Sequence, residues 1–80
     1  MQHLVCRKNS RKLSGPDMIV VHYTAGTSAR TAAEFLAKEE VKASAHLVIG
    51  RQGELFQLVP FDTEAWHAGR SCYGGRANLN

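Results

Sequence analysis

Histidine is the residue type with the clearest chemical potential in this sequence, because a neutral imidazole is the commonest protein ligand for transition metals. The 80-residue chain contains four histidines: His3, His22, His46 and His67. None of their spacings is the close helical one that places two imidazoles on one metal ion, as in an H-E-x-x-H motif. No acidic residue lies next to His22. Spacing alone therefore does not favour metal binding, and a lone histidine such as His22 is more often a hydrogen-bonded structural residue than a ligand.

The segment that carries His22 predicts a strand. Residues 18–23 form a continuous apolar, β-branched run after the turn signal at residues 14–16. Such a run predicts a strand buried on both faces, as in a sheet covered by helices. Small residues follow at 24–27. We therefore expect His22 near the C-terminal end of a buried strand, where open α/β sheets place their ligands.

A short helix is predicted next, from residue 28 or 31 to about residue 41. Thr31 and Glu34 have capping-box spacing, in which the hydroxyl serves the third amide and the carboxylate reaches back. Apolar residues then recur at the spacing of one helix face: Ala33, Leu36, Ala37 and Val41.

The remainder predicts a hairpin and a long loop. Two alternating runs at residues 44–59 flank a glycine-containing turn at 50–53, which is the signature of a β-hairpin. Residues 60–80 contain no convincing strand or helix, and a loop of this length is typically functional or part of an incomplete unit. The order of strand, helix, hairpin and long loop predicts an α/β fold.

The net charge of +3 is concentrated near the N-terminus, where four cations lie within six positions: Arg7, Lys8, Arg11 and Lys12. One interpretation is an electrostatic site for nucleic acid or another polyanion. The other is a solvated, partly mobile basic N-terminal arm over residues 1–15. No aromatic residues interleave with these charges to stack on bases, so we favour the arm and expect no nucleic-acid partner.

Cysteine content and hydropathy exclude several other classes. Cys6 and Cys72 are too few for a disulfide framework or a cysteine-rich zinc site, and we expect both thiols to be free. No apolar run approaches the roughly 20 residues that span a bilayer, so no membrane partner is expected. An export signal needs about 7–15 apolar residues, which the N-terminus lacks. We therefore expect a cytoplasmic protein.

Four short segments, in order and with matching spacing, resemble the zinc-dependent N-acetylmuramoyl-L-alanine amidases, the amidase type 2 and peptidoglycan-recognition family. They are VVHYTAG at 20–26, SAHLVI at 44–49, GELFQLVP at 53–60, and AWHAG at 65–69 followed by Ser71. Each motif alone is weak, but four in sequence are specific. The resemblance covers residues 16–80, which we interpret as the N-terminal half of an amidase type 2 domain.

The resemblance implies a mixed central β-sheet flanked by helices, with zinc in a groove across the sheet. His22 falls on the family's first zinc ligand. Trp66 and His67 fall in a loop that forms a wall of the substrate groove, and they would touch the muramyl or peptide part. For Trp66, a role as an aromatic anchor of the loop stays equally open. His46 falls on a packed, hydrogen-bonded residue beside the groove rather than on a ligand.

The implied reaction is hydrolysis of the amide that joins N-acetylmuramic acid to the L-alanine of peptidoglycan or of a muropeptide, in a bacterium or a phage. The family's other two ligands and its catalytic glutamate belong to a later part of the domain, and this sequence ends at Asn80. Zinc sites use three or four protein ligands. We therefore expect weak or no zinc binding and an inactive, truncated fragment. The alternative is a non-catalytic peptidoglycan-binding or assembly module.

Two further expectations follow from the resemblance. Half of a sheet-based domain leaves strand edges unpaired, which favours self-association, most simply as a dimer. Contact with the cell wall is expected only if the protein acts as a phage lysin does.

Overall fold

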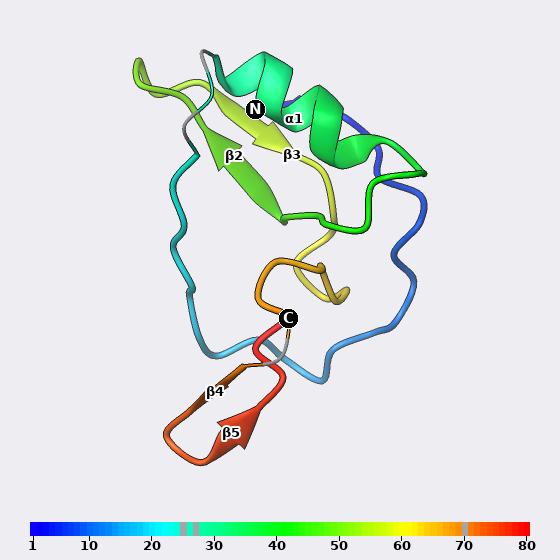
Figure 1. Ribbon diagram of the computed structural model, residues 1–80, viewed down its shortest axis with the longest axis vertical. Coiled ribbons are helices and arrows are strands. Elements are labelled where there is room, and N and C mark those ends of the chain that lie inside the picture. The colour runs from blue at the N-terminus through cyan, green and yellow to red at the C-terminus, as the bar shows by residue number, and fades with distance from the viewer. Residues whose placement is uncertain (25, 27, 70) are drawn as a thin grey trace.

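The computed structural model describes residues 1–24, 26, 28–69 and 71–80 (Figure 1). Its elements in chain order are β1 (Gln2–His3), α1 (Ala29–Ala37), β2 (Leu47–Ile49), β3 (Leu55–Gln57), β4 (Cys72–Tyr73) and β5 (Arg76–Ala77). The first sheet has the order β1-β3-β2, with β1 parallel and β2 antiparallel to β3. The α/β fold with a mixed sheet is confirmed, and α1 is the one helix of the described residues that covers it.

The hairpin predicted over residues 44–59 is confirmed as β2 and β3. Leu47 lies opposite Gln57 and Ile49 opposite Leu55. The turn closes with the Gly50 N–H donating to the Glu54 carbonyl at 2.8 Å. Gly53 has a φ of +86°, a conformation that residues with a Cβ rarely adopt. This turn fixes the register of the sheet on which the core is built.

The predicted helix is confirmed, but its N-terminal cap is not the predicted one. Ser28 is the N-cap, and its Oγ accepts a hydrogen bond from the Thr31 N–H at 3.1 Å. Thr31 therefore lies inside the helix, so the capping box at Thr31 and Glu34 is wrong. Glu34 instead lies 3.5 Å from the guanidinium of Arg30 one turn earlier. A serine three residues upstream competes for the same role, and the backbone conformation decides between them.

The helix ends at Ala37, earlier than predicted, and its C-terminus is held by Lys8. The ammonium of Lys8 donates to the carbonyls of Leu36 at 3.0 Å, Lys38 at 2.7 Å and Val41 at 2.5 Å. The carbonyl of Leu36 lies in the last turn of α1, where carbonyls have no intrahelical partner, and a cation there also complements the helix dipole. No helix in the described part of the chain is long and apolar enough to cross a membrane.

The start of the N-terminal segment is not the solvated arm that the charges predicted. The Leu4 N–H donates to the Gln57 carbonyl at 3.0 Å, and the Cys6 N–H donates to the Leu58 carbonyl at 3.2 Å. Both bonds continue the parallel pairing of β1 with β3. Cys6 is buried, with 5% of its surface exposed. The division of the chain at residue 16 stays a prediction.

The hydrophobic core lies between α1 and the sheet and extends into the loop after β3. Its buried members are Cys6, Ala33, Phe56, Leu58, Val59 and Ala65. Cys6 carries a free thiol, as predicted. The same prediction for Cys72 falls on a side chain outside the described part of the structure.

Residues 18–23 do not form the predicted buried strand. The segment is irregular, and Figure 1 shows it running in cyan outside the sheet. Ile19, Val21 and Tyr23 are 85–94% exposed. A strand requires a neighbour for its backbone groups, and the first sheet of the described residues consists of β1, β3 and β2. The apolar composition was therefore a wrong guide to pairing here.

The long C-terminal segment contains strands that the sequence did not predict. β4 and β5 pair antiparallel across a turn at Gly74 and Gly75, whose φ values are +57° and +80°. Two consecutive residues with positive φ match the right-handed twist of a tight hairpin, and glycine adopts them without strain. The prediction of an unstructured loop is therefore wrong at residues 72–77. Figure 1 shows this hairpin at the end of the molecule opposite α1.

Candidate functional site

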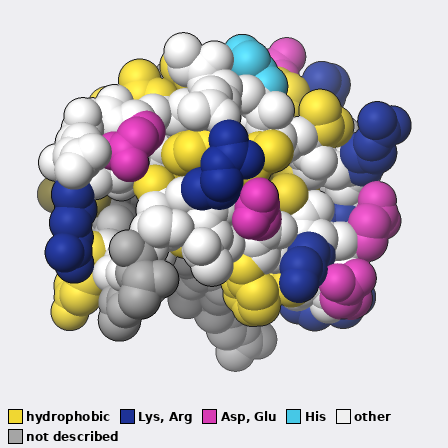
Figure 2. Space-filling view, turned by 90° about the horizontal axis from the view of Figure 1, so that it is seen from above, with side chains coloured by type: hydrophobic (Ala, Val, Ile, Leu, Met, Phe, Trp, Pro, Cys, Tyr) yellow, Lys and Arg dark blue, Asp and Glu magenta, His cyan; other side chains and the backbone are white. Residues whose placement is uncertain are grey.

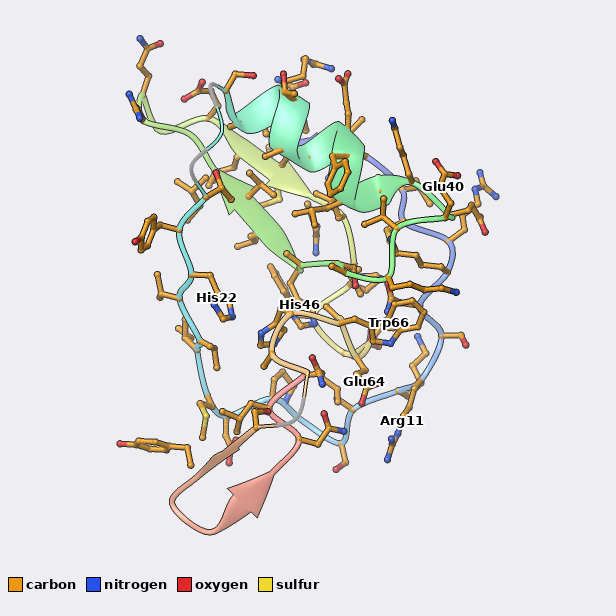
Figure 3. The ribbon with its side chains drawn as sticks, in the orientation of Figure 1. Arg11, His22, Glu40, His46, Glu64 and Trp66 are labelled. Atoms are coloured by element: carbon orange, nitrogen blue, oxygen red, sulfur yellow. The ribbon has the colours of Figure 1, made fainter. Side chains whose placement is uncertain are left out.

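Three of the four histidines converge. His22 Nε2 lies 3.1 Å from His67 Nδ1, and the two rings meet edge to face with centroids 5.3 Å apart. The ring of His46 lies 6.2 Å from that of His67. Figure 3 shows His22 pointing toward His46 from residues 18–23, which we call the outer segment. We call His22, His46 and His67 the histidine cluster. His3, on β1, is not part of it.

The contact between His22 and His67 restricts the protonation states of the two rings. A hydrogen bond between two ring nitrogens needs one donor and one acceptor, so at least one of the two rings is neutral. The pKa of His67 is lowered from its ordinary value of 6.5, first by burial and then by the neighbouring His22 and His46. Backbone hydrogen bonds to Leu79 and Asn80 act in the opposite direction. A neutral imidazole at His67 can bind a metal or accept a proton.

His46 has its own anchor. Its Nε2 lies 2.6 Å from the carbonyl oxygen of Thr63, so this nitrogen carries the hydrogen and donates it. Thr63 is 3% exposed, which makes the acceptor part of the buried framework. The tautomer of His46 is thereby fixed. Its structural role beside a groove stays a prediction.

The loop that contains Trp66 and His67 is attached to the segment before β2. The Trp66 N–H donates to Ser44 Oγ at 2.8 Å, and the Ser44 N–H donates to the Trp66 carbonyl at 2.9 Å. Figure 3 shows Trp66 on the opposite side of His46 from His22. The structure therefore brings His67 to His22 and leaves Trp66 away from that contact. A role for either side chain in substrate binding stays a prediction.

The zinc that the resemblance implies does not fit the described residues by themselves. Among them, no group of three or more histidine, cysteine, aspartate or glutamate side chains is placed to hold a metal ion. His22 Nε2 and His67 Nδ1 are bonded to each other, and Nε2 of His46 is bonded to Thr63. A zinc site needs at least three protein ligands. A complete site would need a ligand from outside the described residues.

Three of the four basic residues near the N-terminus, Lys8, Arg11 and Lys12, pair within the fold. Arg11 lies 3.6 Å from the Glu64 carboxylate, and Lys12 lies 3.6 Å from that of Asp62. Lys8 is bonded to carbonyls at the end of α1. Figure 2, which looks onto the α1 end, shows basic, acidic and apolar side chains interspersed on that face. This arrangement does not favour a surface for nucleic acid, which needs clustered positive charge.

Sequence reasoning missed the residues that hold the His67 loop. Ser44, Ser71 and Asn80 make hydrogen bonds that support or surround it. Serine and asparagine are common in loops, and their partners here lie 8–22 positions away. Ser44 and Ser71 lie in the segments that carry the family resemblance, but no local pattern indicates which residues they contact.

Comparisons with known proteins agree with these motifs. The family described as N-acetylmuramoyl-L-alanine amidase matches residues 11–80. The 1,6-anhydro-N-acetylmuramyl-L-alanine amidase AmpD of Salmonella typhimurium LT2 is 37% identical over 95 residues, which cover 98% of this chain and 49% of that protein. The AmpD proteins of Citrobacter freundii (50% identical over 58% of this chain and 25% of theirs) and Escherichia coli K12 (55% over 50% and 22%) are also similar. The chain spans about half the length of the first of these relatives. No solved structure matches it.

Proposed function

Because the chain belongs to the N-acetylmuramoyl-L-alanine amidase family, we propose that it contributes to hydrolysis of the amide between N-acetylmuramic acid and L-alanine. The names of the relatives favour a muropeptide with a 1,6-anhydro sugar as the substrate class. The observation that carries the proposal is the contact between His22 and His67, which lies within the matched residues.

In this proposal, His22 is a zinc ligand and His67 is the residue that holds its ring in place. A bound zinc ion supplies polarisation of a carbonyl and a more acidic water. A ligand ring needs a hydrogen-bonding partner on its other side or a contact that fixes its orientation. His67 can provide that contact at Nε2 of His22, 3.1 Å away, which would leave Nδ1 of His22 for the metal, and burial lowers the pKa of His67. His67 and Trp66 remain the proposed contacts for the substrate.

The 80-residue chain by itself should bind zinc weakly and should be inactive, because no group of three metal-binding side chains is placed to hold an ion among its described residues and a zinc site requires at least three protein ligands. Protein dialysed against metal-free buffer should contain well under one zinc ion per chain by elemental analysis. Stoichiometric zinc that is lost in His22→Ala, but kept in His3→Ala, would contradict this expectation.

A chimera tests the proposed activity. This chain replaces the matched half of the Salmonella typhimurium relative, and release of stem peptide from an anhydro-muropeptide is measured by mass spectrometry. We expect zinc-dependent release that His22→Ala abolishes and His3→Ala leaves unchanged, since His3 lies outside the histidine cluster. A folded chimera without activity would overturn the proposal. Full activity in the His22→Ala chimera would remove His22 from the site.

The alternative is a non-catalytic module that binds peptidoglycan or takes part in assembly. The incomplete set of metal donors among the described residues favours it. Trp66 is the only tryptophan, so its fluorescence reports on ligand binding at the loop. Saturable binding of a muropeptide by the chain, together with a folded but inactive chimera, would support the module over the enzyme.

Self-association as a dimer also stays a proposal, as does a cytoplasmic location. Ile19, Val21 and Tyr23 expose apolar surface on a segment that no strand of the described residues pairs with. Two copies could pair there, since exposed edges and apolar surfaces favour association. Sedimentation equilibrium over a hundredfold concentration range should show a dimer that Val21→Lys weakens. A monomer at all concentrations would contradict it.

A further inference from the structure

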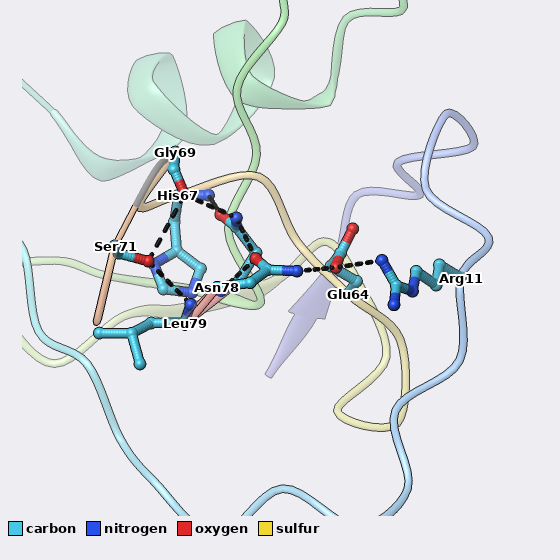
Figure 4. Close-up of polar contacts among 8 residues, drawn as sticks. Arg11, Glu64, His67, Gly69, Ser71, Asn78 and Leu79 are labelled. Atoms are coloured by element: carbon cyan, nitrogen blue, oxygen red, sulfur yellow. Dashed lines mark hydrogen bonds and ion pairs between the residues drawn. The ribbon is translucent and has the colours of Figure 1, made fainter. Parts of the chain in front are cut away.

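One amide side chain holds three consecutive residues of the His67 loop. Asn80 Oδ1 accepts hydrogen bonds from the N–H of His67 at 2.8 Å and the N–H of Ala68 at 2.9 Å. Asn80 Nδ2 donates to the carbonyl of Gly69 at 3.2 Å. Figure 4 shows His67 and Gly69 of this loop beside Ser71 and Asn78. The loop therefore depends on a side chain 11–13 positions further along the chain.

Asn80 is itself held in place from several sides. Its Nδ2 also donates to Asn78 Oδ1 at 2.6 Å, and its carbonyl accepts from the Ala65 N–H at 3.4 Å. Asn78 Nδ2 donates to Glu64 Oε2 at 3.0 Å, and the same oxygen lies 3.6 Å from Arg11. Asn78 has a φ of +61°, which asparagine tolerates better than most residues. The network thus connects the His67 loop to the N-terminal segment (Figure 4).

The β4–β5 hairpin is the element that returns Asn80 to the loop. Ser71 precedes the hairpin, and its Oγ accepts from the Leu79 N–H at 2.8 Å. The Asn78 N–H donates to the Ser71 carbonyl, also at 2.8 Å. These two bonds close the base of the hairpin. The chain after β5 is consequently held beside the residues before β4.

We propose that Asn80 is a positioning residue for the site: it sets the His67 loop so that His67 Nδ1 meets His22 Nε2. The chemistry requires an amide. It needs an oxygen that accepts two N–H donors and a nitrogen that donates to a carbonyl, and among neutral side chains only asparagine and glutamine provide both. The importance of this positioning for catalysis rests on the proposed function, but the geometric claim does not.

Imidazole nitrogen resonances test the claim in the 80-residue chain itself. Long-range ¹H–¹⁵N spectra at one fixed pH distinguish donor, acceptor and freely exchanging ring nitrogens. In Asn80→Ala, we expect the ring signals of His67 and His22 to shift toward those of a free imidazole, and the cross-relaxation between the two rings to be lost. The His46 signals should stay unchanged, because that ring is bonded to Thr63. A general loss of structure would move all three.

Two further variants complete the experiment. Leu79→Ala is the matched control, since Leu79 contributes its backbone N–H to the network and should leave the ring signals unchanged. Asn80→Asp keeps the acceptor for the His67 and Ala68 N–H groups but replaces the Nδ2 donor with an oxygen that faces the Gly69 carbonyl and Asn78 Oδ1, so it should also weaken the contact between the rings. If Asn80→Ala does not fold, Asn80→Asp decides: a folded Asp variant without the contact supports the proposal, and one that keeps it overturns it.

Unchanged His22 and His67 signals in a folded Asn80→Ala variant would also overturn the proposal. Failure of the proposed function is seen separately, as a folded but inactive chimera, and it leaves these spectra as they are. If the proposed function and the positioning role of Asn80 both hold, Asn80→Ala in the chimera should lower kcat with a smaller effect on KM. The substitution then changes the geometry at the reacting atoms more than it changes substrate binding in the groove.

Discussion

Two regions of this molecule have similar apolar composition and opposite environments. In the packed region of α1, β2 and β3, Phe56 is 2% exposed and Val59 is fully buried. In the outer segment, residues 18–23, Val21 is 85% and Tyr23 94% exposed. The packed region has strand partners on both sides of β3, and the outer segment has none within the described residues. Apolar composition shows what a segment can bury, and strand pairing decides whether it does.

The histidine cluster joins these two regions. His46 is bonded to the buried Thr63, and the His67 loop is bonded to Ser44 and Asn80. His22 comes from the outer segment and meets the others through His67. The two rings of the packed side are therefore preorganised, and the predicted ligand is the part of the cluster with the least support.

The largest expected difference between the regions is in the free energy of unfolding. Phe56→Ala should lower it by about 3–5 kcal/mol, because truncating a buried aromatic loses burial and leaves a cavity. Val21→Ala should change it by less than about 0.5 kcal/mol, as exposed substitutions usually do. Urea unfolding followed by circular dichroism measures both.

Similar losses for Phe56→Ala and Val21→Ala would contradict the comparison. They would show that Val21 is covered in solution, as in the proposed dimer. Repeating the measurement at tenfold lower protein concentration separates the two cases, since only an association between chains makes stability depend on concentration.

The second prediction concerns Lys8, which attaches the N-terminal segment to the packed region. Lys8→Met keeps the aliphatic stem and removes the ammonium, leaving three carbonyls in the last turn of α1 and just after it without this donor. We expect a loss of about 1–2 kcal/mol, in the range for hydrogen bonds from a charged group near a helix end. Lys12→Met is the matched control, because its ion pair with Asp62 is exposed and worth little. Equal losses of stability in Lys8→Met and Lys12→Met would contradict the role of Lys8 in holding the end of α1.

The third prediction separates the observed cap from the predicted one. Ser28→Ala should cost about 1 kcal/mol, because it removes the acceptor for the Thr31 N–H. Thr31→Ala keeps that backbone bond and should cost a few tenths of a kcal/mol at most, about the scale of local side-chain pairs on a helix. Thermal melting of the two variants measures the difference. The reverse order would restore the capping box at Thr31 and Glu34.

Local sequence patterns predicted the helix and the β2–β3 hairpin, but they could not predict contacts between residues that are far apart in the sequence. The hairpin follows from two alternating runs around Gly53, and the helix follows from its apolar stripe; both are encoded by neighbouring residues. The pairing of Gln2 with Phe56 brings together distant parts of the chain, and so does the bond from the His67 N–H to Asn80. Family motifs identified His22, but its contact with His67 depends on how several loops fold against one another.

The smallest expected effect is a dependence of stability on pH that comes from His67. Its pKa in the folded chain is lowered below 6.5 by burial and by His22 and His46. The folded chain therefore binds fewer protons than the unfolded chain as the pH falls below 6.5, and stability that is present above this pH is lost as the pH falls through the folded pKa. His67→Gln removes this titration and the repulsion between His67 and the other two rings. We expect the urea midpoint to fall less between about pH 7.5 and about pH 5 in His67→Gln than in the wild type. This pH range brackets the pKa of an ordinary histidine.

His3→Gln, on the edge strand β1, should behave as the wild type does. If His67→Gln and the wild type lose stability equally on acidification, His67 is not preferentially neutral in the folded chain, and the packed side of the cluster is less preorganised than its hydrogen bonds indicate.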